Sequence, residues 1–268
     1  MKLKDKKKNL ISKIQELKSV VIAFSGGVDS TFLLAISYEI LGEAVIAVTA
    51  DSPLHSQQEL SSAVGIAKDI GVAHIIIRSR ELALPEFVQN NPNRCYLCKK
   101  ALFSELLDIA AEKKKSHVVD GANLDDLDDF RPGMQATREL GIVSPLMEAS
   151  LRKADIRALA KEMNLPTWNK PSNACLASRI PYGDSLSPKR LQMVADAEAV
   201  LLEMGLDRCR VRHHGDVARI EVTDQGMQRL WIADNRRTVV ERLRKIGFIH
   251  VALDLEGYIR GSMNRGLT

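Results

Sequence analysis

The stretch Ser-Gly-Gly-Val-Asp-Ser at residues 25–30 constrains the fold of this chain more than any other. It lies between a short apolar run at 20–24 and an apolar segment at 31–38, so the pattern predicts a buried strand that leads into a helix. Gly26 and Gly27 let the backbone turn tightly and bring bare N–H groups close to an anion, and the dipole of the following helix favours negative charge there. The stretch therefore predicts a phosphate-binding loop.

The polar side chains of this loop indicate which phosphate it binds. Ser25 and Ser30 add hydroxyl donors. A Walker loop has a lysine after its last glycine, whereas Val28 follows Gly27 here. The loop therefore suits pyrophosphate better than a transferable γ-phosphate, and Asp29 is a candidate ligand for a Mg²⁺ ion that bridges the phosphate oxygens. The alternative is a plain glycine turn followed by an N-capped helix.

In its position after a first predicted strand, the string SGGVDS resembles the signature of the PP-loop ATP pyrophosphatases. The resemblance implies that ATP is the cofactor, that it is cleaved between its α- and β-phosphates, and that a substrate is adenylated. It also implies that Asp29 and Ser30 act in catalysis beside the leaving pyrophosphate.

Composition and length fit a globular protein of two domains. Of the 268 residues, 45% are hydrophobic and 27% are charged, and no apolar run approaches the roughly 20 residues that a transmembrane helix requires. The lysine-rich start of the chain precedes a segment too short and too polar for a signal-peptide core, so we expect a cytoplasmic protein without membrane contact. The net charge of +4 is too small to indicate nucleic-acid binding.

Short β-branched runs alternate with helical patterns through residue 146. Strands are predicted at 20–24, 44–49, 74–77, 117–120 and 142–146, with helices at 6–18, 31–41, 56–70 and 100–112 among them. This alternation predicts an α/β fold with a doubly wound parallel sheet. Ligands bind at the carboxyl ends of such strands, so the polar residues there are candidate neighbours of the nucleotide or its metal. They are Asp51, Ser52, Gly121, Asp125 and Asp126. The alternative for each segment is a polar turn.

From residue 184 the pattern changes. A helix at 191–202, strands at 209–213 and 217–222, a helix at 238–245 and a last strand at 249–253 predict a small α+β domain. We therefore expect two domains, 1–183 and 184–268. Arg210 and Arg212 would lie on one face of their strand about 7 Å apart, which suits a clamp for a phosphate monoester. The alternative is a solvent-facing basic strand.

Four cysteines in a reducing compartment favour metal or sulfur chemistry over disulfides. Cys95 and Cys98 form a C-x-x-C pair, and Cys175 lies in a proline-containing loop. Three thiolates can hold three irons of a 4Fe–4S cluster and leave the fourth iron open to carry a sulfide. Zinc and plain or redox-active thiols are the alternatives. Cys209 is a poor additional ligand, because its strand should turn it away from the arginine face.

Four segments together resemble the LarE family of ATP-dependent sulfur transferases, namely 50–54, 121–126, 168–179 and 210–215. The resemblance covers nearly the whole chain. It implies that a carboxylate of pyridinium-3,5-biscarboxylic acid mononucleotide is adenylated and then converted to a thiocarboxylic acid, during synthesis of the nickel-pincer nucleotide.

The same resemblance implies roles for individual residues. Cys175 would handle the sulfur. The residues implied around the substrate and its phosphate are Ser178, Arg179, Glu198, Arg210 and Arg212. Some members of the family have only the cysteine that matches Cys175 and give up its sulfur, whereas Cys95 and Cys98 favour the cluster-bearing branch here. The implied partners are sulfide or another sulfur donor, other nickel-pincer biosynthesis enzymes and further copies of the chain.

Two other functions stay open. Certain tRNA thiolases of the PP-loop group also combine a C-x-x-C pair with one distant cysteine, although this sequence has no evident zinc ribbon or long basic stripe for RNA. A non-catalytic iron–sulfur scaffold belongs to a different class, and for such a scaffold the phosphate loop would be superfluous.

Overall fold

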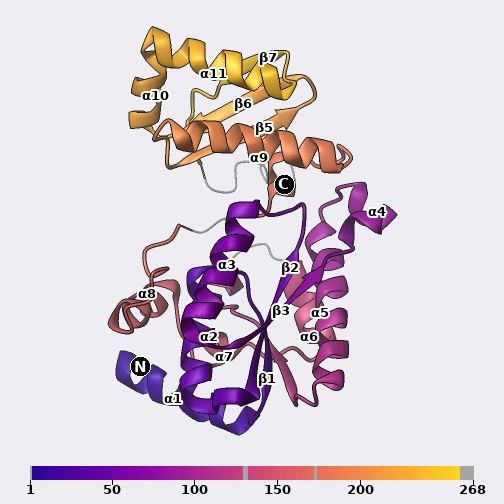
Figure 1. Cartoon of the computed structure of the whole chain (residues 1–268), viewed down its shortest axis with the longest axis vertical. Coiled ribbons are helices and arrows are strands. Elements are labelled where there is room, and N and C mark those ends of the chain that lie inside the picture. Colours follow the sequence, from indigo (N-terminus) through magenta and orange to yellow (C-terminus); the bar gives the residue numbers. More distant parts are fainter. Residues whose placement is uncertain (1, 129–131, 172–173, 260–268) are drawn as a thin grey trace. The chain divides into compact units, whose positions relative to one another are not determined.

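The computed structural model describes residues 2–128, 132–171 and 174–259 (Figure 1). Two compact units make up the chain. Unit 1 consists of Met1–Ser52, Ser56–Glu81 and Asn93–Asn173, and unit 2 of Pro53–His55, Leu82–Pro92 and Ala174–Thr268. The division into 1–183 and 184–268 stays a proposal, and residues 172 and 173 of the family-like segment 168–179 lie outside the described residues.

Unit 1 is built on a parallel sheet. In the described residues its strands are β1 (Val20–Ala23), β2 (Val45–Asp51), β3 (Ala73–Arg78) and β4 (His117–Val119), in the order β3-β2-β1-β4. The register pairs Val21 of β1 with Ile46 on one side and Val118 on the other. Short apolar strands are typical of a parallel sheet that is covered on both faces.

Helices cover both faces of this sheet (Figure 1). On one face lie α1 (Leu3–Leu17), α2 (Val28–Leu41), α3 (Gln57–Ile70), α7 (Pro145–Glu148) and α8 (Lys153–Glu162). Their apolar side chains form one core with Val20 and Ile22 of β1. The other face, with Val21, packs against α5 (Arg94–Glu112), beside which lies α6 (Gly133–Glu139). The predicted doubly wound α/β sheet is confirmed.

Two details of the prediction for unit 1 are wrong. Residues 142–146 are not a strand: Val143 makes a single parallel bridge to Val119, and α7 begins at Pro145. A proline has no N–H for a ladder but fits the first turn of a helix, so pairing ends there. The C-x-x-C pair was expected just before a helix, whereas α5 begins at Arg94 and contains both cysteines.

Unit 2 contains a mixed sheet in the order β5-β6-β7 within the described residues. Its elements are β5 (Cys209–His214), β6 (Val217–Val222), β7 (His250–Leu253), α9 (Pro188–Glu203), α10 (Asp224–Trp231) and α11 (Ala233–Ile246). β5 and β6 are antiparallel, and β6 and β7 are parallel. The three helices share one core with Val211 and Ile220 of the sheet. The predicted α+β pattern is confirmed, although the prediction missed α10 and began α11 at Thr238 instead of Ala233.

Short helical turns connect these elements. They are η1 (Gly42–Ala44), η2 (Glu81–Ala83), α4 (Pro85–Val88), η3 (Leu124–Asp128) and η4 (Leu176–Arg179). η3 and η4 carry residues that the sequence singled out for chemistry.

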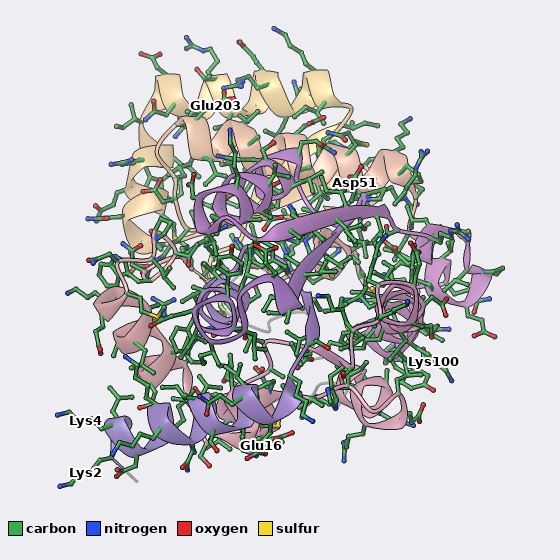
Figure 2. All side chains as sticks on the ribbon, turned by 60° about the horizontal axis from the view of Figure 1, so that its bottom comes forward. Lys2, Lys4, Glu16, Asp51, Lys100 and Glu203 are labelled. Carbon is green, nitrogen blue, oxygen red and sulfur yellow. The ribbon has the colours of Figure 1, made fainter. Side chains whose placement is uncertain are left out.

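The lysine-rich start of the chain forms a helix face. Figure 2 shows Lys2 and Lys4 pointing away from the ribbon at α1, and Lys6 forms an ion pair with Asp155 of α8. These lysines are therefore solvated or ion-paired. No helix in the described part of the chain is long and apolar enough to cross a membrane.

Candidate active site

The predicted phosphate loop joins β1 to α2 and turns at Gly26, whose φ is +66°. A side chain at Gly26 would crowd α3, since a Cβ there would lie 3.0 Å from the Cβ of Ala63. The hydroxyls of Ser25 and Ser30 lie 3.1 Å apart, and Ser30 donates to the carbonyl of Gly27 at 3.3 Å. The loop is thus held in shape by its own side chains.

Gly121 lies against the first turn of α2. A Cβ at Gly121 would be 3.1 Å from the backbone nitrogen of Ser30, so only glycine lets the chain after β4 approach the loop this closely. The strand order reverses between β1 and β4. In α/β sheets the crevice at such a point binds ligands. The structure therefore brings Gly121 to the phosphate loop, which supports its predicted place near the nucleotide.

Asp125 and Asp126 have different surroundings. The N–H of Lys153, and then the guanidinium of Arg152, hold the pKa of the Asp125 carboxyl below its usual range, with contacts of 2.8 and 2.5 Å. The carboxylate of Asp126 is buried and accepts the N–H of Asn123 at 3.0 Å. Asp125 thus binds the start of α8 and Asp126 the backbone just before η3, and the metal or nucleotide role predicted for them stays a prediction.

Two lysines from the C-terminal part of unit 1 reach the phosphate loop. Lys153, the first residue of α8, donates to the carboxylate of Asp29, and Lys170 donates to the carbonyl of Gly26 at 2.9 Å. They lie 124 and 144 positions from their partners in sequence, so no local motif could have revealed them.

Asp29 fits the chemistry of a magnesium ligand. It lies in the first turn of α2, directly after the glycines of the loop. Mg²⁺ binds proteins through one or two carboxylates and fills its remaining positions with phosphate oxygens and water. Asp29 offers one such carboxylate at the phosphate loop, and the ion itself stays a prediction.

The segment after β2 also lies at the carboxyl end of the sheet. Asp51, labelled in Figure 2, is the last residue of β2, and its carbonyl accepts the N–H of Ser79 at 3.0 Å. The hydroxyl of Ser52 donates to the buried carboxylate of Glu81. Because β2 is the parallel neighbour of β1, Asp51 and Ser52 lie at the carboxyl end of the sheet, where the phosphate loop also lies. Sequence reasoning missed Glu81, which begins η2 in the connection after β3.

Cys95 and Cys98 are three residues apart at the start of α5, so they lie on one side of the helix. Cys95 is exposed and Cys98 is half-buried. In the same turn, the Nζ of Lys99 lies 3.4 Å from the buried carboxylate of Asp120, the residue that follows β4. This carboxylate also accepts the hydroxyl of Ser144 at 2.7 Å. This contact ties the C-x-x-C end of α5 to the carboxyl end of β4.

In unit 2, Cys175 lies in a turn that we call the cysteine turn, residues 174–179, and it directly precedes η4. The Cys175 carbonyl accepts the hydroxyl of Ser178 at 2.8 Å and an N–H of Arg179 at 3.1 Å. Arg179 is 2% exposed, and it makes a two-point contact of 2.9 and 3.0 Å with the carboxylate of Glu198 on α9. The structure thus brings together Ser178, Arg179 and Glu198, which hold the backbone around Cys175.

β5 alternates between the core and a charged face. Cys209 and Val211 belong to the core, while Arg210 and Arg212 lie on the opposite face, as the period of a strand predicts. Burial raises the pKa of the Cys209 thiol to about 12. Cys209 is therefore turned away from the arginines, which confirms the reason for rejecting it as a metal ligand.

The two arginines of this face differ in burial. Arg212 is buried, makes contacts of 2.9 and 2.6 Å with the carboxylate of Glu221, and donates to the carbonyl of Ser178 at 3.0 Å. Arg210 is half-buried, donates to the carbonyl of Cys209 and lies 5.2 Å from the ring of Tyr258. Because Arg212 is buried and paired, this strand is not a plain solvent-facing basic strand.

The three candidate cluster cysteines belong to different units, Cys95 and Cys98 to unit 1 and Cys175 to unit 2. Within the described ranges, no group of three or more histidine, cysteine, aspartate or glutamate side chains is arranged to hold a metal ion. The iron–sulfur cluster stays a prediction.

Sequence comparison shows the family to which the chain belongs. Residues 2–101, which include the phosphate loop and the C-x-x-C pair, match the model of the NAD synthase family. Over 268 residues the chain is 38% identical to the pyridinium-3,5-bisthiocarboxylic acid mononucleotide synthase of Lactiplantibacillus plantarum, covering 99% of this chain and 96% of that protein. This chain belongs to that synthase family. The LarE resemblance and its PP-loop are confirmed.

Two other relatives differ in how much of this chain they match. An uncharacterised protein of Synechocystis is 40% identical over 266 residues, which is 99% of each chain. A tRNA-specific 2-thiouridylase of Desulforamulus reducens is 26% identical over 58% of this chain and 53% of its own length. The synthase family is thus matched over the full chain, and the tRNA enzyme over only part of it.

Proposed function

We propose that the protein is an ATP-dependent, AMP-forming sulfurtransferase that converts carboxylates of pyridinium-3,5-biscarboxylic acid mononucleotide to thiocarboxylic acids. The match to the synthase over nearly the full length of both chains carries this proposal. A phosphate loop in unit 1 and a braced cysteine turn in unit 2 support it. We place the reaction in the cytoplasm, with sulfide or a sulfur donor and other nickel-pincer biosynthesis enzymes as partners of a homo-oligomer.

The first step activates the carboxylate. One of its oxygens attacks the α-phosphorus of ATP, the bond from that phosphorus to the bridging oxygen breaks, and pyrophosphate leaves with the electron pair. The N–H groups at the start of α2 would bind the leaving pyrophosphate. Asp29 would hold Mg²⁺, which supplies positive charge to the phosphate oxygens. Ser30, with its hydroxyl on the carbonyl of Gly27, keeps the loop in shape.

In the second step a sulfur nucleophile attacks the carbonyl carbon of the acyl-adenylate. AMP leaves with one oxygen of the original carboxylate and the electron pair of its C–O bond. Thiolate and sulfide are nucleophilic at neutral pH, whereas a hydroxyl is not. We assign the handling of this sulfur to Cys175, and the two carboxylates of the substrate require two rounds.

We assign the phosphate of the mononucleotide to the charged face of β5. Arg210 and Arg212 would donate to its oxygens, since guanidinium groups match phosphate geometry. Glu221 fixes the position of Arg212, and Ser178, Arg179 and Glu198 would surround the substrate from the cysteine turn and α9.

A substrate-dependent exchange of labelled pyrophosphate into ATP tests the adenylation. We expect exchange with the mononucleotide and none with bulk tRNA. Exchange that requires tRNA and falls steeply with salt would support a tRNA thiolase instead, because counterion release makes RNA binding salt-dependent. Absence of exchange with either substrate would favour the iron–sulfur scaffold.

We further propose that Cys95, Cys98 and Cys175 hold a 4Fe–4S cluster. Three thiolate ligands leave one iron open, and such a cluster would supply an iron that carries the sulfide. The exposed and half-buried thiols of the C-x-x-C pair, on one side of α5, support this donor set. The protein would then survive each cycle unchanged.

Iron and sulfide analysis of anaerobically purified protein tests the cluster. The double variant Cys95→Ala/Cys98→Ala should lose iron and repeated turnover together, and the core variant Cys209→Ala should keep both. One product per chain from the double variant, with desulfurised Cys175 found by mass spectrometry, would show that Cys175 is sacrificed.

A further inference from the structure

The phosphate loop has no lysine in its own sequence, yet a lysine ammonium lies on its carboxylate. Lys153 donates to Asp29 from the first position of α8. The second lysine, Lys170, donates to the carbonyl of Gly26, the glycine with positive φ. One lysine therefore contacts the ionised side chain of the loop and the other contacts its backbone.

The fold directs Lys153 to this point through several contacts. Its backbone N–H donates to Asp125 at 2.8 Å, and the N–H of Leu124 donates to the carbonyl of Leu151 at 2.9 Å. Farther along α8, Ile156 belongs to the core that also contains side chains of α2. Asp125 thus fixes the start of α8 beside the phosphate loop, so the position of Lys153 does not depend on its own ion pair.

The ion pair between Lys153 and Asp29 is accessible to water. Their side chains are 28% and 21% exposed, and pairs of this kind contribute little to folding stability. A second ion pair joins Lys6 of α1 to Asp155 of α8, and its side chains have similar exposures of 15% and 23%. The two ion pairs should therefore contribute similarly to the folding stability of the protein. Of the two, only the pair of Lys153 and Asp29 contacts the phosphate loop.

We infer that Lys153 is the cation that this phosphate loop lacks, and that its ammonium binds an oxygen of the β- or γ-phosphate of ATP and of the departing pyrophosphate. The inference rests on the proposed adenylation. When the bond from the α-phosphorus to the bridging oxygen breaks, the electron pair goes to pyrophosphate, and Lys153 neutralises the charge without giving up its proton. Asp125 acts as a positioning residue for Lys153, and Lys170 stabilises the loop at Gly26.

Calorimetric titration with inorganic pyrophosphate and Mg²⁺ tests this inference without the sulfur chemistry. We expect Lys153→Ala and Lys153→Gln to weaken pyrophosphate binding by about 10- to 100-fold, because a charge-assisted hydrogen bond is lost. Lys153→Arg should restore most of the affinity. The matched control Lys6→Ala removes a comparable ion pair and should bind pyrophosphate like wild type.

Rates separate a role in the reaction from a role in folding. Substrate-dependent pyrophosphate release by Lys153→Ala should have a kcat lower by about 100-fold, with a melting temperature shifted no more than that of Lys6→Ala. Unchanged pyrophosphate affinity in Lys153→Ala, or an equal loss in Lys6→Ala, would overturn the inference. The proposed function fails separately: wild-type protein that binds pyrophosphate but shows no exchange with the mononucleotide would refute that function and leave the role of Lys153 intact.

Discussion

Units 1 and 2 both have cationic side chains among the residues that we assign to the reaction, but these side chains differ in their exposure to water. In unit 1 the ammonium of Lys153 makes a water-accessible contact with Asp29. In unit 2 the side chains of Arg179 and Arg212 are 2% and 6% exposed, and each makes a two-point contact with a glutamate.

This difference indicates which charges exchange partners when a ligand binds and which are already fixed in position before it binds. An accessible ammonium exchanges partners at little cost, since water and salt already screen its ion pair. A buried arginine is different, because removing one partner of a buried pair weakens the compensation of the remaining charge in the interior. We therefore expect substitutions in unit 1 to change catalysis with little loss of stability, and substitutions of the buried arginines to lower stability in addition to any effect on the substrate.

The largest expected effect concerns the buried pair of unit 2. Arg212→Ala should lower the free energy of unfolding by about 3 kcal/mol, because Glu221 is 1% exposed and would keep only the half-buried Arg219, at 3.2 Å, as its guanidinium partner among the contacts described here. Arg210→Ala, on the same face of the same strand, should cost about 1 kcal/mol. Urea denaturation followed by circular dichroism measures both, and equal losses would contradict the distinction between the two arginines.

In unit 1 the expected effect is on rate. Asp29→Asn should lower substrate-dependent pyrophosphate release by about 100- to 1000-fold, since an electrostatic contact to the leaving group is lost. The free energy of unfolding should change by no more than about 1 kcal/mol, because the ion pair with Lys153 is accessible to water. A wild-type rate in this variant would refute the role of Asp29, and a large loss of stability would erase the contrast with unit 2.

Arg210 allows a finer test, since it is half-buried on the face that we assign to the substrate phosphate. Arg210→Ala should weaken mononucleotide binding by about 10-fold and leave ATP binding unchanged. The control Arg242→Ala removes another arginine of unit 2, one that pairs with Glu203 at 2.5 Å on the helical side. Equal losses for both ligands would show that the phosphate clamp is misplaced.

The smallest effect concerns the thiols. Cys209 should be the slowest cysteine to react with iodoacetamide in the folded protein, because its pKa of about 12 leaves almost no thiolate at neutral pH. Cys95 is exposed and, in protein without bound iron, should react quickly. Peptide mass spectrometry resolves the two, and equal rates would show that Cys209 is not held in the core of unit 2.

The parts of this molecule that depend on neighbouring residues could be predicted from sequence. The loop at 25–30 combines glycines, hydroxyls and a helix start within six positions. The helix predicted at 56–70 ends where expected, since Gly71 follows α3 with a φ of +83°. Period-two alternation correctly placed Arg210 and Arg212 on one face of β5. In each case the physical cause lies within a few residues of the effect.

The parts that depend on distant residues could not be predicted. Neither the spacing nor the composition around Lys153 indicates Asp29, which is 124 positions away. The paired state of Arg212 depends on Glu221, a residue of another strand. The expected strand at 142–146 failed because apolar periodicity in so short a run does not separate a strand from the start of a helix at Pro145. Contacts between residues far apart in the sequence determine these features of the structure.

The most direct test of the proposed reaction follows the carboxylate oxygens. Mononucleotide labelled with ¹⁸O in its carboxylates is incubated anaerobically with the protein, ATP, Mg²⁺ and sulfide, and AMP and product are examined by mass spectrometry. We expect each AMP to contain one ¹⁸O and each product carboxylate to have one oxygen replaced by sulfur, in equal amounts. Unlabelled AMP, or sulfur transfer without any AMP, would contradict adenylation and with it the proposed function.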